Sequence, residues 1–157
     1  VLFIGTQVSG QSKVAHIDVQ ALMTAMPEMK VAQDQMKKIQ ESYDKDYKNM
    51  VTEYQTKLQK YEQESATAGD ALNDTRSKEM QDMGNRIQQF QQTAQKELGQ
   101  KEMDLIKPIM EKAQKAIQKV AKAKGVNYVL DATTGSGVLF AEGGIDVLAD
   151  VKKELGF

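Results

Sequence analysis

The chain has 157 residues, the length of a single domain, and leaves no room for two full cores. It carries 21 Lys and Arg against 22 Asp and Glu residues, a net charge of −1, which disfavours nucleic-acid binding and binding to an anionic membrane surface. With no Cys and one His, it offers no thiolate zinc site, cysteine nucleophile or His-rich metal site, so we expect no enzyme and no catalytic, cofactor or metal residues.

Residues 1–12 open with the apolar run VLFI and continue with small and polar residues. This pattern has two interpretations. It is the tail of a signal peptide, cut near Gln11, or it is an edge strand or disordered tail. No other apolar run approaches the roughly 20 residues that a membrane span needs.

Residues 14–19 alternate apolar and polar side chains, which predicts a strand that leads into an apolar turn at residues 21–23. Pro27 then suits the first position of a helix, where its missing N–H costs nothing, and Glu28 favours the positive end of the helix dipole. We therefore predict that a helix begins at Pro27.

The apolar residues of this helix recur in steps of three and four, an eleven-residue repeat. They are Met36, Ile39, Tyr43, Tyr47, Met50, Tyr54, Leu58 and Tyr61. A long helix with one apolar seam is not stable alone in water, so it needs a partner.

The partner is predicted on the same chain. Residues 65–74 read SATAGDALND, which breaks the seam and predicts a tip, with Asn73 or Asp74 as the cap of a second helix. The second helix carries its own seam, formed by Met80, Met83, Ile87, Phe90, Ala94, Leu98, Leu105 and Ile109. Residues 27–124 therefore predict an antiparallel helical hairpin, a coiled-coil arm, in which Pro27 lies opposite about Ala113.

The base of the second helix carries two adjacent apolar stripes between Leu105 and Val120, which predicts burial on two sides. Pro108 lies within this stretch and removes a backbone donor, so we expect a bend there. The bend is either a harmless kink or a functional hinge, and Pro108 is our hinge candidate.

After Gly125 the residue pattern again predicts strands. Residues 126–131 and 138–141 predict two strands of a hairpin joined by a turn at 133–137, and residues 145–155 predict a helix that Asp146 caps. The expected fold is α+β: the long hairpin stands on a small β-strand body formed by residues 13–26 and 125–157, together one domain over 13–157. So thin a body leaves strand edges unpaired, and assembly with other copies would cover them.

Few residues suggest a catalytic, phosphate-binding or metal-binding role. His16 has no suitably spaced carboxylate pair, so we interpret it as an ordinary strand histidine. The segment at 135–137 lacks the Lys and helix of a phosphate loop, which favours a turn. Asp18 and Asp131 end their strands, and we interpret them as turn residues in preference to a metal pair.

The arm is rich in methionine, a flexible side chain that adapts to many apolar partners. Most of these residues are expected to fill the seam. Met50 lies on the seam, Val51 beside it and Met103 off it, and these three are our candidates for contact with a partner.

The order of these segments resembles the Skp/OmpH family of periplasmic chaperones, over nearly the whole chain from Lys13 onward. Each motif by itself is a weak indication of the family, and the resemblance depends on their order and spacing. The motifs are KVAHIDVQ at 13–20, MPE at 26–28, IKPI at 106–109, AI and VA at 116–117 and 120–121, and GVNYVLD at 125–131.

The resemblance implies a periplasmic homotrimer in which three bodies join into a β-barrel-like hub and three hairpins surround a cavity. Family members hold unfolded outer-membrane β-barrel proteins there, without ATP or a cofactor. The residues that we expect in the hub are Val14, Ile17, Tyr128, Leu130 and Leu139.

This chain departs from the best-known members, which are strongly basic, because it is near neutral. We therefore assign no lipopolysaccharide or membrane-surface site to its residues. Two alternatives stay open: a structural or scaffolding coiled-coil protein, and a cytosolic subunit like those of prefoldin.

Overall fold

The structure is a computed structural model that describes residues 13–157, so both interpretations of residues 1–12 lie outside the described residues. The described residues divide into two compact units. The sheet unit contains the residues up to Lys30 together with Ile106–Phe157, and the hairpin unit contains Val31–Leu105. The predicted body ended at residue 26 and resumed at 125. The sheet unit is larger because it includes the buried residues Ile109, Ala113, Ala116 and Val120 of the second long helix.

Strand β1 (Val14–Ile17) confirms the predicted first strand, but the predicted turn at residues 21–23 is wrong. Residues Val19–Ala25 form a short helix, α1. The carboxylate of Asp18 accepts a hydrogen bond from the backbone N–H of Ala21 at 2.7 Å, which satisfies a donor that a helix start leaves unpaired. This cap and the burial of Leu22 both favour a helix in this short apolar segment.

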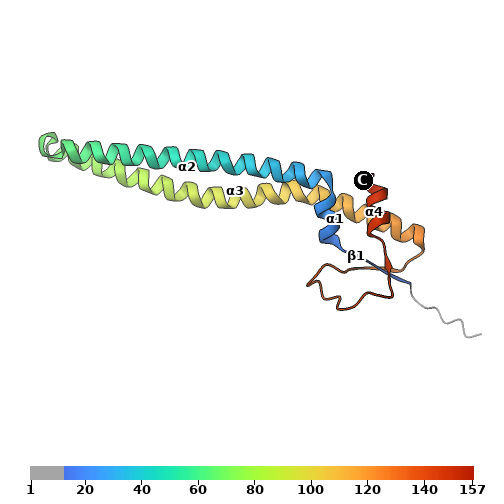
Figure 1. Ribbon diagram of the computed structural model, residues 1–157. Helices are drawn as coiled ribbons and strands as arrows, with labels where there is room; N and C mark the ends of the chain where they lie inside the picture. Colours follow the sequence, from blue (N-terminus) through green and yellow to red (C-terminus); the bar gives the residue numbers. More distant parts are fainter. Residues whose placement is uncertain (1–12) are drawn as a thin grey trace, which may run out of the picture. The chain divides into compact units, whose positions relative to one another are not determined.

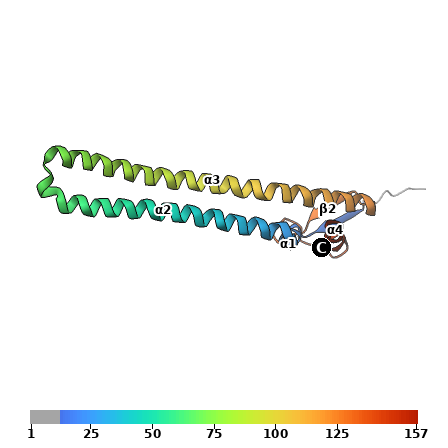
Figure 2. The ribbon, with the colours of Figure 1, turned by 90° about the horizontal axis from the view of Figure 1, so that it is seen from above.

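Helices α2 (Pro27–Ala68) and α3 (Asp70–Lys124) run side by side in opposite directions and confirm the predicted hairpin (Figures 1 and 2). Only Gly69 separates them, with a φ of 77° that favours glycine. The predicted cap at Asn73 or Asp74 is wrong, because α3 begins at Asp70. Asn73 instead donates its side-chain amide to the carbonyl oxygen of Ser65 at 2.9 Å and ties the two helices together.

The predicted seam of the hairpin unit is confirmed. On α2 its eight residues from Met36 to Tyr61 are all half-buried, and most residues between them are exposed. On α3, Met80, Met83 and Ala94 are buried. The rings of Tyr43 and Phe90 lie 5.9 Å apart across the seam, and the Tyr43 hydroxyl donates to Glu97. Within the sheet unit, an ion pair between Glu28 and Lys112 agrees with the predicted pairing of Pro27 with about Ala113.

Strands β2 (Tyr128–Asp131) and β3 (Ile145–Asp146) both pair with β1, and the sheet order is β2-β1-β3. Both pairings are parallel, with Val14 opposite Tyr128 and Ala15 opposite Ile145. The predicted β-hairpin is therefore wrong, and residues 138–141 form no strand. Two parallel strands cannot be joined by a tight turn, so residues 132–144 have to carry the chain back to the other side of β1.

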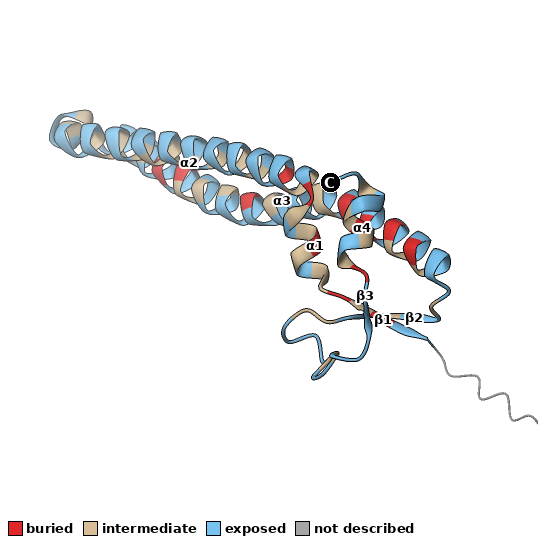
Figure 3. Cartoon of the chain, turned by 45° about the vertical axis from the view of Figure 1, so that its right-hand side comes forward, coloured by how far each residue is buried: buried red, intermediate tan, exposed pale blue. Residues whose placement is uncertain are grey.

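The chain ends in helix α4 (Leu148–Leu155), which begins three residues later than predicted. Asp146 does support its start, because its carboxylate accepts from the N–H of Leu148 at 2.8 Å. The buried residues of the sheet unit lie on β1, α1, α3 and α4 and at the ends of these helices, and are drawn in red in Figure 3. They include Ala15, Ile17, Leu22, Met26, Val147 and Val151.

Candidate functional site

The sheet has one covered face and one open face. Neighbouring residues of a strand point to opposite faces, and residues paired across strands point to the same face. Ala15 and Ile17 are almost fully buried on the face toward α1 and α4. Figures 1 and 3 show these helices on one side of the strands and the 132–144 loop on the other. By the strand register, the other face carries Val14, His16, Tyr128, Leu130 and Asp146, and we call it the open face.

Three residues of the open face are apolar or aromatic and exposed. Val14 is 39% exposed, Leu130 45% and Tyr128 61%. All-parallel sheets are normally covered on both faces. Here the part of the chain that the structure describes covers one face with helices and only part of the other with a loop.

The loop encloses a hollow of about 290 Å³ against the open face. The strand residues that line it are Val14, Ala15, His16 and Leu130, and the loop residues are Val138, Phe140, Ala141, Gly143 and Gly144. A Cβ atom on Gly144 would lie 2.7 Å from Nδ1 of His16, so any larger residue here would force the imidazole or the loop to move. The loop therefore packs directly against the imidazole ring.

Leu139 and Phe140 are the most exposed large apolar residues of this loop, at 98% and 76%. Leu139 stands between two residues that line the hollow, yet it contacts almost nothing of its own chain. An aliphatic side chain so fully in water is a candidate for contact with another molecule.

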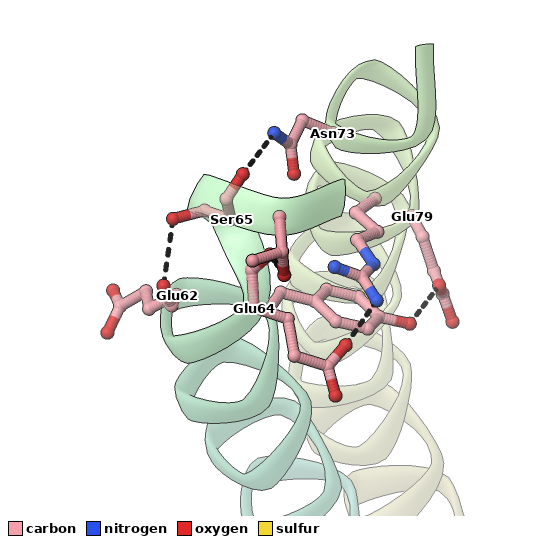
Figure 4. A network of polar contacts seen from close by, with 8 residues as sticks. Glu62, Glu64, Ser65, Asn73 and Glu79 are labelled. Carbon is pink, nitrogen blue, oxygen red and sulfur yellow. Dashed lines mark hydrogen bonds and ion pairs between the residues drawn. The ribbon is translucent and has the colours of Figure 1, made fainter. Parts of the chain in front are cut away.

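The hairpin unit carries a polar network near Gly69, drawn in Figure 4. Glu79 of α3 accepts from the Lys57 ammonium at 2.5 Å and from the Tyr61 hydroxyl at 2.6 Å, both on α2. These bonds, that of Lys57 first, hold the pKa of the Glu79 carboxyl below its ordinary value. The same contacts raise the pKa of Lys57 and of Tyr61, because the carboxylate favours their protonated forms.

Arg76 completes this network. Its guanidinium lies 4.6 Å from the centre of the Tyr61 ring and forms an ion pair with Glu64. Its side chain is only 15% exposed, so the pair is better shielded than an ordinary surface salt bridge. The network therefore joins α2 to α3 near the turn at Gly69.

Comparison with known families gives a match to Outer membrane protein (OmpH-like) over residues 13–155, which is most of the chain. The chain belongs to the OmpH-like family. A solved structure of similar fold comes from Caulobacter crescentus and is described as a candidate outer membrane chaperone, OmpH-like. The two share 18% identity and a TM-score of 0.81, over 99% of this chain and 90% of that one. A comparison with curated proteins gave no match.

For this OmpH-like chain, the structure places four of the five hub candidates at the surface: Val14, Tyr128, Leu130 and Leu139. Ile17 differs from them, because it is 1% exposed and lies in the core of its own unit, and its part in a trimer stays a prediction. The alternation along β1 explains the difference, since Ile17 points to the covered face. The sequence also missed Phe140 and the hollow, which only the loop path reveals.

The client-contact candidates lie in the hairpin unit. Met103 is 64% exposed, whereas Met50 and Val51 are both half-buried along the seam side of α2. Pro108 lies in the sheet unit, and α3 continues through it as an unbroken helix. Its role as kink or hinge stays a prediction.

Asp18 and Asp131 occupy turn and cap positions, in agreement with their interpretation as turn residues. The Thr133 hydroxyl donates to Asp131 at 2.6 Å and lies 3.2 Å from Asp18. The bonds from Thr133 hold the pKa of the Asp131 carboxyl below its ordinary value. Across residues 13–157, no cluster of three or more potential metal-ligating side chains occurs. Nor does any helix of that range combine the length and apolar character needed to span a bilayer.

Proposed function

We propose that this chain is the subunit of a homotrimeric, ATP-independent periplasmic holdase. It binds unfolded outer-membrane β-barrel proteins between its helical hairpins, prevents their aggregation and catalyses no reaction. Membership of the OmpH-like family supports this role, and so does a similar fold in a protein described as a candidate outer membrane chaperone.

The open face of the sheet is the observation that carries the proposal. A single chain exposes Val14, Tyr128 and Leu130 on an all-parallel sheet, an arrangement that calls for a cover. Other copies of the same chain supply that cover in a trimer, and the hairpins are then held together in one assembly. Many weak contacts along several hairpins give avidity for an unfolded client without sequence specificity.

The first test is the native mass by light scattering, alone and after dilution of an unfolded outer-membrane β-barrel protein into the sample. We expect about 52 kDa alone, three times the chain mass of 17.5 kDa, and an increase by one client without aggregation. A trimer that ignores the client would move the function to a scaffolding coiled coil. A monomer or dimer would contradict the trimer and its cavity.

A second test addresses the client surface. We expect Val51→Asp combined with Met103→Asp to weaken client holding about tenfold and leave the trimer intact, because charge on these side chains opposes apolar contact. Thr52→Asp with Gln95→Asp is the matched control, since both residues are exposed and the added charge is the same. Client aggregation, followed by turbidity, reports the holding. Equal holding by both variants would show that Val51 and Met103 do not contact clients.

A further inference from the structure

We propose that Leu139 of one copy inserts into the hollow on the open face of the next copy. This inference rests on the proposed trimer and identifies the contact that closes it. The contact joins two different surfaces, one from each copy. One is the exposed Leu139, and the other is the hollow between strands β1 and β2 and the 132–144 loop.

The hollow suits an aliphatic side chain. Its volume of about 290 Å³ is far larger than one water molecule, whose share of liquid volume is about 30 Å³. Of the described residues that line it, only His16 can carry a charge, and the others are apolar or glycine. Water in such a space finds few hydrogen-bond partners, so an apolar occupant that displaces it is favoured.

Leu139 is the apolar group best presented for this purpose. It is 98% exposed, so it does not fill the hollow of its own chain, although its neighbours Val138 and Phe140 line that hollow. Every chain carries both the exposed Leu139 and a hollow that can receive it. A second copy is therefore favoured over an unrelated protein as the source of the inserted side chain. Because Leu139 and the hollow are different surfaces, the contact is heterologous, and it joins chains head to tail. Such contacts close into a ring when the rotation between copies allows it, as a three-fold assembly requires.

Two substitutions test the contact from its two sides. Leu139→Asp removes the inserted group, and its near-complete exposure predicts an unchanged fold. Ala141→Phe fills the hollow, and Val14→Trp fills it from β1 should the first variant fail to fold. For each we expect about a 100-fold rise in the concentration needed for assembly, since a buried leucine contributes strongly to association. Leu72→Asp is the control, because Leu72 is 45% exposed but lies in the hairpin unit, and it should assemble normally.

Mixing the variants gives the decisive result. The Leu139→Asp chain keeps an intact hollow, and the Ala141→Phe chain keeps an intact Leu139. A heterologous contact therefore predicts a one-to-one heterodimer of about 35 kDa, twice 17.5 kDa, that grows no further. Sedimentation analysis of each variant, alone and mixed, measures this.

The outcomes separate this inference from the proposed function. A wild-type trimer whose Leu139→Asp variant stays trimeric overturns the insertion of Leu139 and leaves the holdase trimer standing. Variants that dissociate but form no heterodimer on mixing overturn the head-to-tail arrangement. A wild-type chain that is monomeric overturns both this inference and the proposed trimer.

Discussion

The two units of this chain cover their apolar side chains in different ways. The hairpin unit pairs two helices that follow one another directly, and each covers the apolar seam of the other. The sheet unit joins β1 to strands more than one hundred residues away and still leaves Val14, Tyr128 and Leu130 exposed. The hairpin unit thus pairs its apolar seam within one chain and leaves single apolar residues such as Met103 exposed, whereas the sheet unit leaves an apolar sheet face that another copy can cover.

The charged side chains along the hairpin seam can be compared with those on the open face of the sheet. In the hairpin unit, Lys57, Tyr61 and Arg76 link the helices through carboxylates at the margin of the seam. The sheet unit has comparable ion pairs of lysines with Glu28, Asp150 and Glu154. On its open face the register places one carboxylate, Asp146, beside His16, and the hollow there is lined mostly by apolar residues. Assembly through the open face would therefore desolvate few charged groups.

The largest expected effect comes from the same substitution placed in each unit. Leu22→Ala removes a fully buried side chain of the sheet unit and should lower the free energy of unfolding by about 2–5 kcal/mol, because it leaves a cavity. Leu58→Ala in the half-buried seam should cost about 1 kcal/mol. Urea unfolding at one fixed protein concentration measures both, since assembly contributes to stability. Equal losses would mean that the seam is packed as tightly as the sheet-unit core.

A smaller effect is expected from the network near Gly69. Arg76→Ala removes the ion pair with Glu64 and the contact with the Tyr61 ring, and should cost about 1–2 kcal/mol. Lys78→Ala, at an exposed position two residues away, is the control and should change little. Hydrogen exchange of peptides that cover residues 57–80 locates the loss. Unchanged exchange in Arg76→Ala would show that the network does not hold the helix ends together.

Two glycines of the hairpin unit should respond with opposite signs. Gly99 lies inside α3 with open space around it, so Gly99→Ala should raise stability by about 0.5–1 kcal/mol. Gly69 has a φ of 77°, so Gly69→Ala should lower stability by about 1 kcal/mol. Thermal unfolding measures both variants. A loss in Gly99→Ala would indicate that helix α3 needs flexibility at that point.

The smallest expected effect is on stability at low pH. The contacts that lower the pKa of Glu79 stabilise the folded state above the ordinary carboxyl value of 4.5, and this stabilisation is lost as the pH falls below it. Glu79→Gln should therefore be less stable than wild type at pH 7, and the two should converge in acid. Urea midpoints from pH 7 to pH 3 give the comparison, with Glu62→Gln, at an exposed position, as the control. A difference that persists at pH 3 would assign the effect to lost packing.

The hairpin was predictable because its information is local. The three- and four-residue steps from Met36 to Tyr61 require a second helix, and the break around Gly69 places the turn. The cap was wrongly predicted at Asn73 because Asn is a common helix cap. Here its side chain bonds Ser65 across the tip instead, and the sequence does not distinguish the two roles. The helix α1 was missed because seven residues are too few to show a helical period.

By itself, the sequence determined the α+β class, the hairpin and its seam, the first strand, and a resemblance that the family match over residues 13–155 bears out. Only the tertiary structure decided the direction of the strands, the burial of Ile17, and the hollow beside Leu139. The physical reason is distance along the chain. A helical seam repeats every few residues and can be read locally, whereas the pairing of Val14 with Tyr128 and the path of the 132–144 loop are set by contacts between remote segments.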